Sequence, residues 1–141
     1  MQIGVETSRS VENKRIFVVH NDDITRTVLQ FMLHDENETH ELGSLAEAYA
    51  KGAEWRPDLI LLGLSTVETD GAGVLADIAA RFPGCKILLV AEPGQDAQAQ
   101  GYLKSGAHGV LTKPLTVESV RRRVDMVLGR LAVPMIQLQV I

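Results

Sequence analysis

The chain has 141 residues, which is the usual size of one domain rather than two. Apolar residues make up 45% of it and charged residues 23%, and these proportions exclude a disordered or fibrous chain. Eighteen acidic against fourteen basic residues give a net charge of -4, which does not favour direct binding of nucleic acid.

The sequence contains few signals that indicate a cellular compartment. The longest apolar runs, such as 59–62, are far shorter than the roughly 20 residues that a membrane-spanning helix needs. Residues 6–15 are polar where a signal peptide would be apolar. The single Cys85 can form neither an intramolecular disulfide nor a zinc site by itself. We therefore expect a cytoplasmic protein in a reducing environment.

The first predicted unit is a strand, a loop and a helix. Residues 15–19 form a β-branched run that ends at the polar cluster 20–23, and apolar residues then recur at helical spacing as far as residue 33. Asp22 or Asp23 is well placed to cap the helix, because a short carboxylate accepts the free N–H groups of a first turn.

The same unit then repeats along the chain. Further strands are predicted at 39–42, 59–62, 86–90 and 109–112. Helices are predicted at 45–55 and at about 95–104. Another helix is predicted to end before Pro83-Gly84, with an apolar side made of Leu75, Ile78, Ala79 and Phe82. The last helix starts with Thr116 as its N-cap, and its predicted buried stripe is Val117, Val120, Val124, Val127 and Leu131.

Five strand-helix units with short connections predict the α/β class, with a five-stranded parallel sheet between two layers of helices. In such sheets, ligand chemistry gathers where the carboxyl ends of the strands meet. The residues at those positions are His20, Asn21, Gly63, Ala91 and Lys113.

Three spaced motifs carry a family resemblance. The first is PDLILLGL at residues 57–64, followed by Asp70-Gly71. The second is Gly106-Ala107 followed by Lys113-Pro114. The third is the pair Arg26 and Leu29, whose distance from the end of the first strand matches the same family. Over about residues 15–131 the chain resembles the receiver domain of bacterial response regulators, a CheY-like, flavodoxin-like fold. This resemblance implies strand order 2-1-3-4-5 and a cis Lys113–Pro114 peptide bond.

The chain departs from the family at the functional positions. Family members have two acidic residues that bind Mg²⁺ after the first strand, a phosphate-accepting Asp after the third, a Ser or Thr after the fourth, and an aromatic residue and a Lys in the fifth. Here those positions hold, in order, His20-Asn21, Gly63, Ala91, Val110 and Lys113. Only the Lys is retained.

These departures predict lost chemistry. Phosphoryl transfer to a carboxylate needs that carboxylate as nucleophile and a hard cation beside it, and Gly63 supplies no nucleophile. Ala91 and Val110 also lack the hydroxyl and the ring that report phosphate to the surface in the family. We therefore expect no acyl phosphate, no metal, no cofactor and no enzymatic activity.

An alternative register makes Asp22-Asp23 the acidic pair. It requires two more residues in the first strand and moves Arg26 and Leu29 off the family spacing. It would still leave Gly63 without a nucleophile.

Two single residues have competing interpretations. His20 could be a metal ligand or a proton donor, but a polar cap at a strand end is the favoured interpretation. Lys113 could bind an anion, but an ion pair with Asp22, Asp23 or Asp70 is favoured because an unpaired cation in a cleft is costly.

The resulting hypothesis is a pseudo-receiver, a phosphorylation-independent module that acts by protein contact in a bacterial signalling system. About ten residues follow the last helix, so we expect the output to be a partner's surface, with the fourth helix, fifth strand and fifth helix as first candidate. Two alternatives stay open: a conventional Mg²⁺-dependent phosphoreceiver, which Gly63 opposes, and a flavodoxin-type small-ligand binder, which the acidic cluster 20–23 opposes.

Both ends of the chain are predicted to lie outside the receiver-like domain, which we place at 15–131. Residues 1–14 form an N-terminal arm and residues 132–141 a C-terminal tail. Apolar residues alternate with others in both (Met1, Ile3, Val5; Ile136, Leu138, Val140), which predicts strands. These strands would pair with each other or with a second copy, which would give a homodimer.

Overall fold

The computed structural model describes residues 14–71 and 73–130. Within them, five parallel strands form one sheet in the order β2-β1-β3-β4-β5. The strands are β1 (Arg15–Val19), β2 (Glu38–Leu42), β3 (Leu59–Gly63), β4 (Lys86–Ala91) and β5 (Gly109–Thr112). The predicted α/β class and strand order are therefore confirmed.

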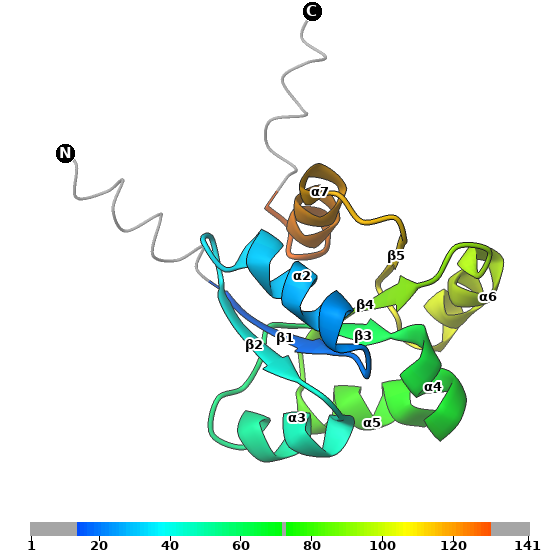
Figure 1. Cartoon of the computed structure of the whole chain (residues 1–141). Helices are drawn as coiled ribbons and strands as arrows, with labels where there is room; N and C mark the ends of the chain where they lie inside the picture. The colour runs from blue at the N-terminus through cyan, green and yellow to red at the C-terminus, as the bar shows by residue number, and fades with distance from the viewer. Residues whose placement is uncertain (1–13, 72, 131–141) are drawn as a thin grey trace, which may run out of the picture.

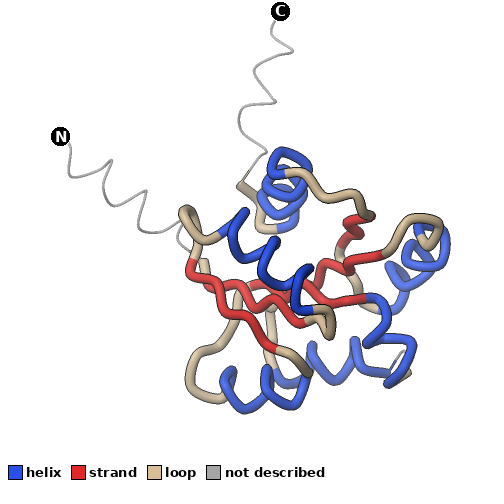
Figure 2. The backbone as a smooth tube through the Cα atoms, viewed as in Figure 1, coloured by secondary structure: helices blue, strands red, loops and turns tan. Residues whose placement is uncertain are grey.

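Helices cover both faces of the sheet, as Figures 1 and 2 show. They are α2 (Asp23–Leu33), α3 (Leu45–Gly52), α4 (Leu64–Asp70), α5 (Gly73–Arg81), α6 (Asp96–Gln100), the 3-10 helix η1 (Gly101–Ser105) and α7 (Val117–Val127). Asp22 caps α2 by accepting the Thr25 N–H, and Thr116 caps α7, so both predicted capping positions are confirmed.

The strands bury side chains on both faces, because successive residues of a strand point to opposite sides. Alternate residues of β1 and β3 pack on α2 and α7, and the remaining ones pack on α3, α4 and α5. All five residues of β3 are buried, which explains its unbroken apolar sequence.

Several helices differ from the expected ones. The segment after β3 forms helix α4, which was not predicted, and Gly63 is its N-cap residue. The helix expected at 45–55 ends at Gly52, and the one expected at 95–104 divides into α6 and η1 at Gly101.

Two residues expected in the core are exposed instead. Val117 is 42% exposed because it is the first residue of α7 and lies at the rim, and Ala79 faces solvent on α5. Val120 and Val124 of the predicted stripe are fully buried, whereas Val127 is half-buried.

Edge strand β2 carries a charged cluster at its start. The Arg15 guanidinium pairs with the Glu38 carboxylate at 2.6 Å, and the His40 Nε2 lies 2.7 Å from the same carboxylate. Hydrogen bonds from these two side chains hold the pKa of Glu38 below its ordinary value. The Arg15 guanidinium also lies 5.3 Å from the Trp55 ring centroid, so this cluster is packed as well as charged.

No helix within residues 14–71 and 73–130 is long and apolar enough to cross a membrane. The predicted strands in the N-terminal arm and C-terminal tail lie outside the described residues, and so does Leu131 of the last helix's predicted stripe.

Candidate functional site

The candidate site lies at the carboxyl edge of the sheet, where β1 and β3 end side by side (Figure 1). Val19 pairs with Leu62, so the next residues of the two strands, His20 and Gly63, are neighbours. The structure therefore brings together two residues that are 43 positions apart in the sequence.

The His20 ring occupies the space in front of Gly63. Only 5% of His20 is exposed. A Cβ atom placed on Gly63 would lie 2.8 Å from His20 Cδ2, which is closer than non-bonded carbon atoms approach, and 3.1 Å from Nε2. In this arrangement position 63 has room for no side chain at all.

The His20 ring is held in one orientation. Its Nδ1 accepts the backbone N–H of Asp22 at 3.0 Å, so Nδ1 carries no proton and a neutral ring is protonated at Nε2. Burial, and after it the positive charge of Lys113, lowers the pKa of His20. The predicted interpretation of His20 as a strand-end cap bonded to nearby backbone agrees with this geometry.

Lys113 is tied into the site by two contacts. Its Nζ donates to the Thr25 Oγ1 at 2.8 Å and pairs with the Glu92 carboxylate at 2.9 Å. The Thr25 hydroxyl in turn donates to the Asp22 carboxylate at 2.5 Å. This hydrogen bond, and after it the one from the Thr25 backbone N–H, holds the pKa of Asp22 below its ordinary value.

The expectation of an ion pair at Lys113 was correct, but the expected partners were wrong. The carboxylate belongs to Glu92, which follows β4, and Asp22 is reached only through Thr25. Both Glu92 and Thr25 were missed in the sequence analysis. Glu92 directly follows β4, and Thr25 lies in the first turn of the helix after β1. These positions at the carboxyl edge of the sheet could have identified both as site residues.

The other predicted site residues have structural roles or face solvent. Ala91 is fully buried and its carbonyl accepts the backbone N–H of Lys113 at 3.0 Å. Val110 is 6% exposed and belongs to the core. Asn21 is exposed. The Lys113–Pro114 peptide bond is cis, as predicted.

The alternative register does not fit this geometry. β1 ends at Val19, and Asp22 is the N-cap of α2, so strand β1 does not contain the two extra residues. Arg26 pairs with Asp23 and donates to the His20 carbonyl at 2.6 Å, which joins the start of α2 to the end of β1.

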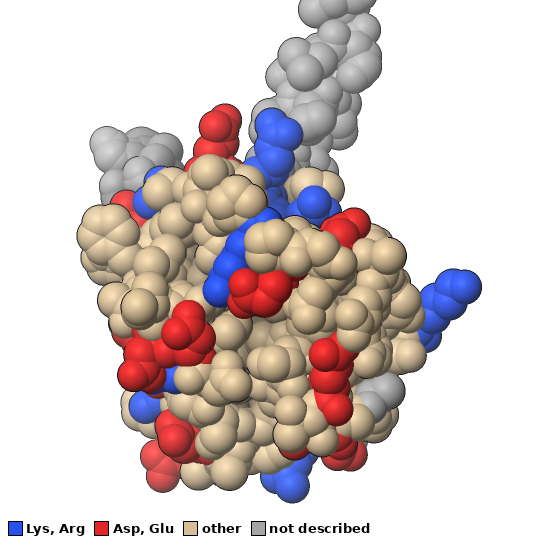
Figure 3. All heavy atoms as spheres, turned by 45° about the vertical axis from the view of Figure 1, so that its right-hand side comes forward, with Lys and Arg blue, Asp and Glu red and all other residues tan. Residues whose placement is uncertain are grey.

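The site's charges are largely neutralised from within, because Lys113 faces Glu92 and Asp22 caps a helix. No three His, Cys, Asp or Glu side chains of the described part of the chain are grouped so that they could hold a metal ion. On the face drawn in Figure 3, basic side chains are scattered among acidic ones and form no continuous basic field.

Comparison with known proteins places this geometry in a family. The chain matches the model of the response regulator receiver domain over residues 16–125. The chemotaxis protein CheY of Listeria monocytogenes is 27% identical over 108 residues, which cover 75% of this chain and 91% of that protein. The transcriptional regulatory protein ResD of Bacillus subtilis is 33% identical over 117 residues, which cover 82% of this chain and 48% of ResD.

The fold of a solved structure agrees with these matches. The crystal structure of a response regulator from Thermotoga maritima superposes with a TM-score of 0.75 at 19% identity, covering 83% of this chain and 98% of the other. With its five parallel strands in the order 2-1-3-4-5 and its sequence match over most of its length, this chain belongs to the response regulator receiver domain family.

Proposed function

We propose that this receiver domain works as a signalling module by protein contact, without phosphorylation of an aspartate and without Mg²⁺. The observation that carries the proposal is the packing of His20 on Gly63. The position that would supply the phosphate acceptor has no carboxylate, and the His20 ring lies 2.8 Å from where its Cβ would be. Phosphoryl transfer to a side chain needs a nucleophile and space in line with it, and both are missing.

The surroundings of Lys113 support the same proposal. A cation that stabilises an incoming phosphoryl group must be free to pair with it. The Lys113 ammonium is already paired with Glu92 and bonded to Thr25. An entering phosphoryl group would have to break the Glu92 pair before gaining this contact.

Exposed apolar side chains support a role in protein contact. Ile24 and Phe31 lie seven residues apart on α2, two helical turns, and each is 72% exposed. Large apolar side chains grouped on one helix are typical of surfaces that bind other proteins.

Intact-mass spectrometry tests the proposal. The full chain is treated with Mg²⁺ and a small phosphodonor such as acetyl phosphate, beside Gly63→Asp and the triple variant His20→Asp, Asn21→Asp, Gly63→Asp. We expect no phosphoryl adduct on the wild type. Gly63→Asp should also stay unmodified, because His20 still fills the space.

The triple variant is the positive control, since it restores the carboxylates and removes the ring, and it should gain one phosphoryl group. A phosphorylated wild-type species, mapped to the carboxyl edge of the sheet, would contradict the proposal. So would a Gly63→Asp variant that is phosphorylated as readily as the triple variant, because the ring would then not be the obstacle.

A further inference from the structure

An open hollow lies at the opposite edge of the sheet from His20 and Gly63. It has a volume of about 490 Å³ and lies where α3 and α5 end, before β3 and β4 begin. This volume falls within the range of small-molecule sites, roughly 300 to 1,000 Å³. The hollow shares no residue with the candidate site at the carboxyl edge.

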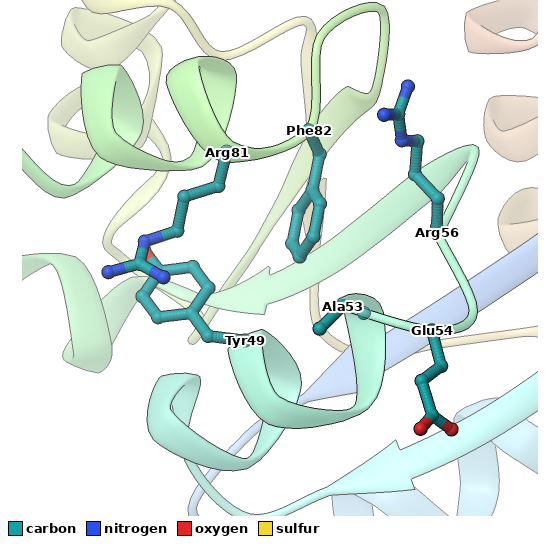
Figure 4. A pocket seen from close by; sticks show the side chains of 7 residues that line it. Tyr49, Ala53, Glu54, Arg56, Arg81 and Phe82 are labelled. Carbon is teal, nitrogen blue, oxygen red and sulfur yellow. The ribbon is translucent and has the colours of Figure 1, made fainter.

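The hollow is lined by the aromatic rings of Tyr49 and Phe82, drawn in Figure 4, and by Gly52. The rings of Tyr49 and Phe82 have centroids 6.0 Å apart at an angle of 52°. The Phe82 ring lies directly over Gly52, where an added Cβ would be 2.3 Å from Phe82 Cζ. Phe82 is only 3% exposed and Tyr49 is half-buried, so the hollow offers an apolar surface on which the partly exposed Tyr49 ring can contact a planar group.

Two arginines line the same hollow and have no ion pair among residues 14–71 and 73–130. The Arg81 guanidinium lies 4.0 Å from the Tyr49 ring centroid, and Arg56 is exposed. Figure 4 shows them on either side of the Phe82 ring, while the Glu54 carboxylate points away from both. Positive charge is therefore in excess among the residues that line the hollow, while the carboxylate of Asp77 acts on Tyr49 beside it.

The Tyr49 hydroxyl adds a donor beside Arg81. It is buried and has no hydrogen-bond partner in the described part of the chain. Burial, and after it the carboxylate of Asp77, raises the pKa of Tyr49, so the hydroxyl keeps its proton. A buried donor without a partner is uncommon in folded proteins, and an acceptor on a ligand would satisfy it.

We propose that this hollow binds a small anion that carries an aromatic ring, such as an aryl phosphate or an aryl carboxylate. The ring would lie against Tyr49 and the exposed Ala53, and the anionic group would pair with the guanidinium of Arg81 or Arg56. A guanidinium suits this role because it binds carboxylate or phosphate oxygens in pairs and can remain stacked on an aromatic ring while it does so.

Titration of the ¹⁵N-labelled full chain with phenyl phosphate tests the proposal by NMR. Inorganic phosphate and phenol, titrated separately, supply the two halves of the probe. We expect saturable shifts of the Gly52, Ala53 and Phe82 amides with phenyl phosphate, and an affinity at least about tenfold tighter than either half gives. The amides of His20 and Gly63 report the opposite edge and should not move.

Arginine variants identify the contact. Arg81→Gln and Arg56→Gln each remove one guanidinium, and we expect one or both to weaken binding about tenfold or more. Arg122→Gln removes an exposed arginine from α7 and is the matched control, which should bind like the wild type. Since Arg81 packs on Tyr49, thermal unfolding is measured for each variant, and Arg56→Gln, at an exposed position, keeps the test independent of folding.

Three results would overturn the proposal. The first is the absence of saturable shifts at Gly52, Ala53 and Phe82 up to millimolar phenyl phosphate. The second is inorganic phosphate binding as tightly as phenyl phosphate, because the ring would then contribute nothing. The third is unchanged binding by the double variant of Arg56 and Arg81, which would place the anion elsewhere.

Discussion

The carboxyl and amino edges of the sheet differ in free space and in charge. At the carboxyl edge, the side chain of His20, the residue after β1, fills the space in front of Gly63, and Lys113 is neutralised by Glu92. At the amino edge, a hollow of about 490 Å³ remains open between two arginines that have no ion pair in the described part of the chain.

This difference determines which edge can gain free energy by binding a ligand. Where a protein fills a cavity with its own ring and pairs its own cation, little free energy is left for an incoming anion. Where a half-buried ring and guanidinium groups without an ion pair line an open hollow, a ligand can still gain free energy by binding.

Removing the ring at the amino edge should have the largest effect. Phe82 is 3% exposed and packs against Phe17, Tyr49 and Gly52, so Phe82→Ala should lower the free energy of unfolding by about 3 to 5 kcal/mol. Urea unfolding measures it. Phe31→Ala is the matched control, because Phe31 is 72% exposed, and it should change stability by less than about 0.5 kcal/mol. Equal losses would refute the assignment of Phe82 to the core.

A methyl group added to Gly52 should also destabilise the amino edge. Its carbon would lie 2.3 Å from Phe82 Cζ, and overpacking of this kind costs about 1 to 3 kcal/mol. The better helix propensity of alanine returns at most about 1 kcal/mol, so the clash should win. Gly73→Ala, on α5 with open space around it, is the control in urea unfolding. A Gly52→Ala protein as stable as the wild type would show that Phe82 moves aside freely.

At the carboxyl edge, Gly63→Ala should cost roughly 1 to 2 kcal/mol because the new Cβ meets the His20 ring. If the ring is the cause, Gly63→Ala should cost less in a His20→Ala background. A double-mutant cycle by urea unfolding measures this coupling. Additive effects would mean that the two positions do not compete for the same space.

Asp22→Ala should lower the melting temperature by a smaller amount, because α2 loses its N-cap and the Thr25 hydroxyl loses its acceptor. Asp22→Asn should retain most of the stability, since an amide oxygen can still cap the helix. Differential scanning calorimetry compares the two. Equal melting temperatures for Asp22→Ala and the wild type would argue against this capping network.

The smallest expected effect is on pH dependence. Burial lowers the pKa of His20 in the folded chain, so below about pH 6.5 the unfolded chain binds more protons than the folded one. Stability should therefore fall as the pH drops through that value. The pKa of His108 is lowered too, by burial and then by Lys86, so each histidine accounts for part of the loss.

Urea unfolding at about pH 7.5 and about pH 5.5 measures this dependence, because the first value lies above and the second below an ordinary histidine pKa. Carboxylates such as Asp22, whose pKa is lowered, lose their contribution only at lower pH. His20→Asn should reduce the loss of stability, and His108→Asn should reduce it separately. An unchanged loss in His20→Asn would mean that His20 is not held neutral.

The sequence predicted the sheet well because its strands are short apolar runs that end at polar or glycine-containing turns. The wholly apolar segment 59–62 is typical of a central strand, and β3 is buried throughout. Helix α4 was missed because it has seven residues and buries only Leu64 and Val67, too few to show helical periodicity.

The site was only partly predictable from the sequence. The residues that end the strands follow from topology, so His20, Gly63 and Lys113 could be placed at one edge in advance. The Lys113 partner could not be chosen, because several acidic residues lie at that edge and the direction of each side chain depends on packing. The same holds for the His20 ring, whose position over Gly63 depends on its rotamer and on the Asp22 N–H.

The charged cluster on β2 has a consequence for how the protein behaves in concentrated solution. An edge strand exposes N–H and C=O groups that can pair with another chain and extend the sheet between molecules. In a parallel, in-register pair, a second β2 would face Glu38 and Glu41 with the same carboxylates, whose charges Arg15 and Arg26 already balance in part. The charged character of this edge is therefore what opposes sheet extension, because Arg15, Glu38 and His40 would lose water if a second strand covered them.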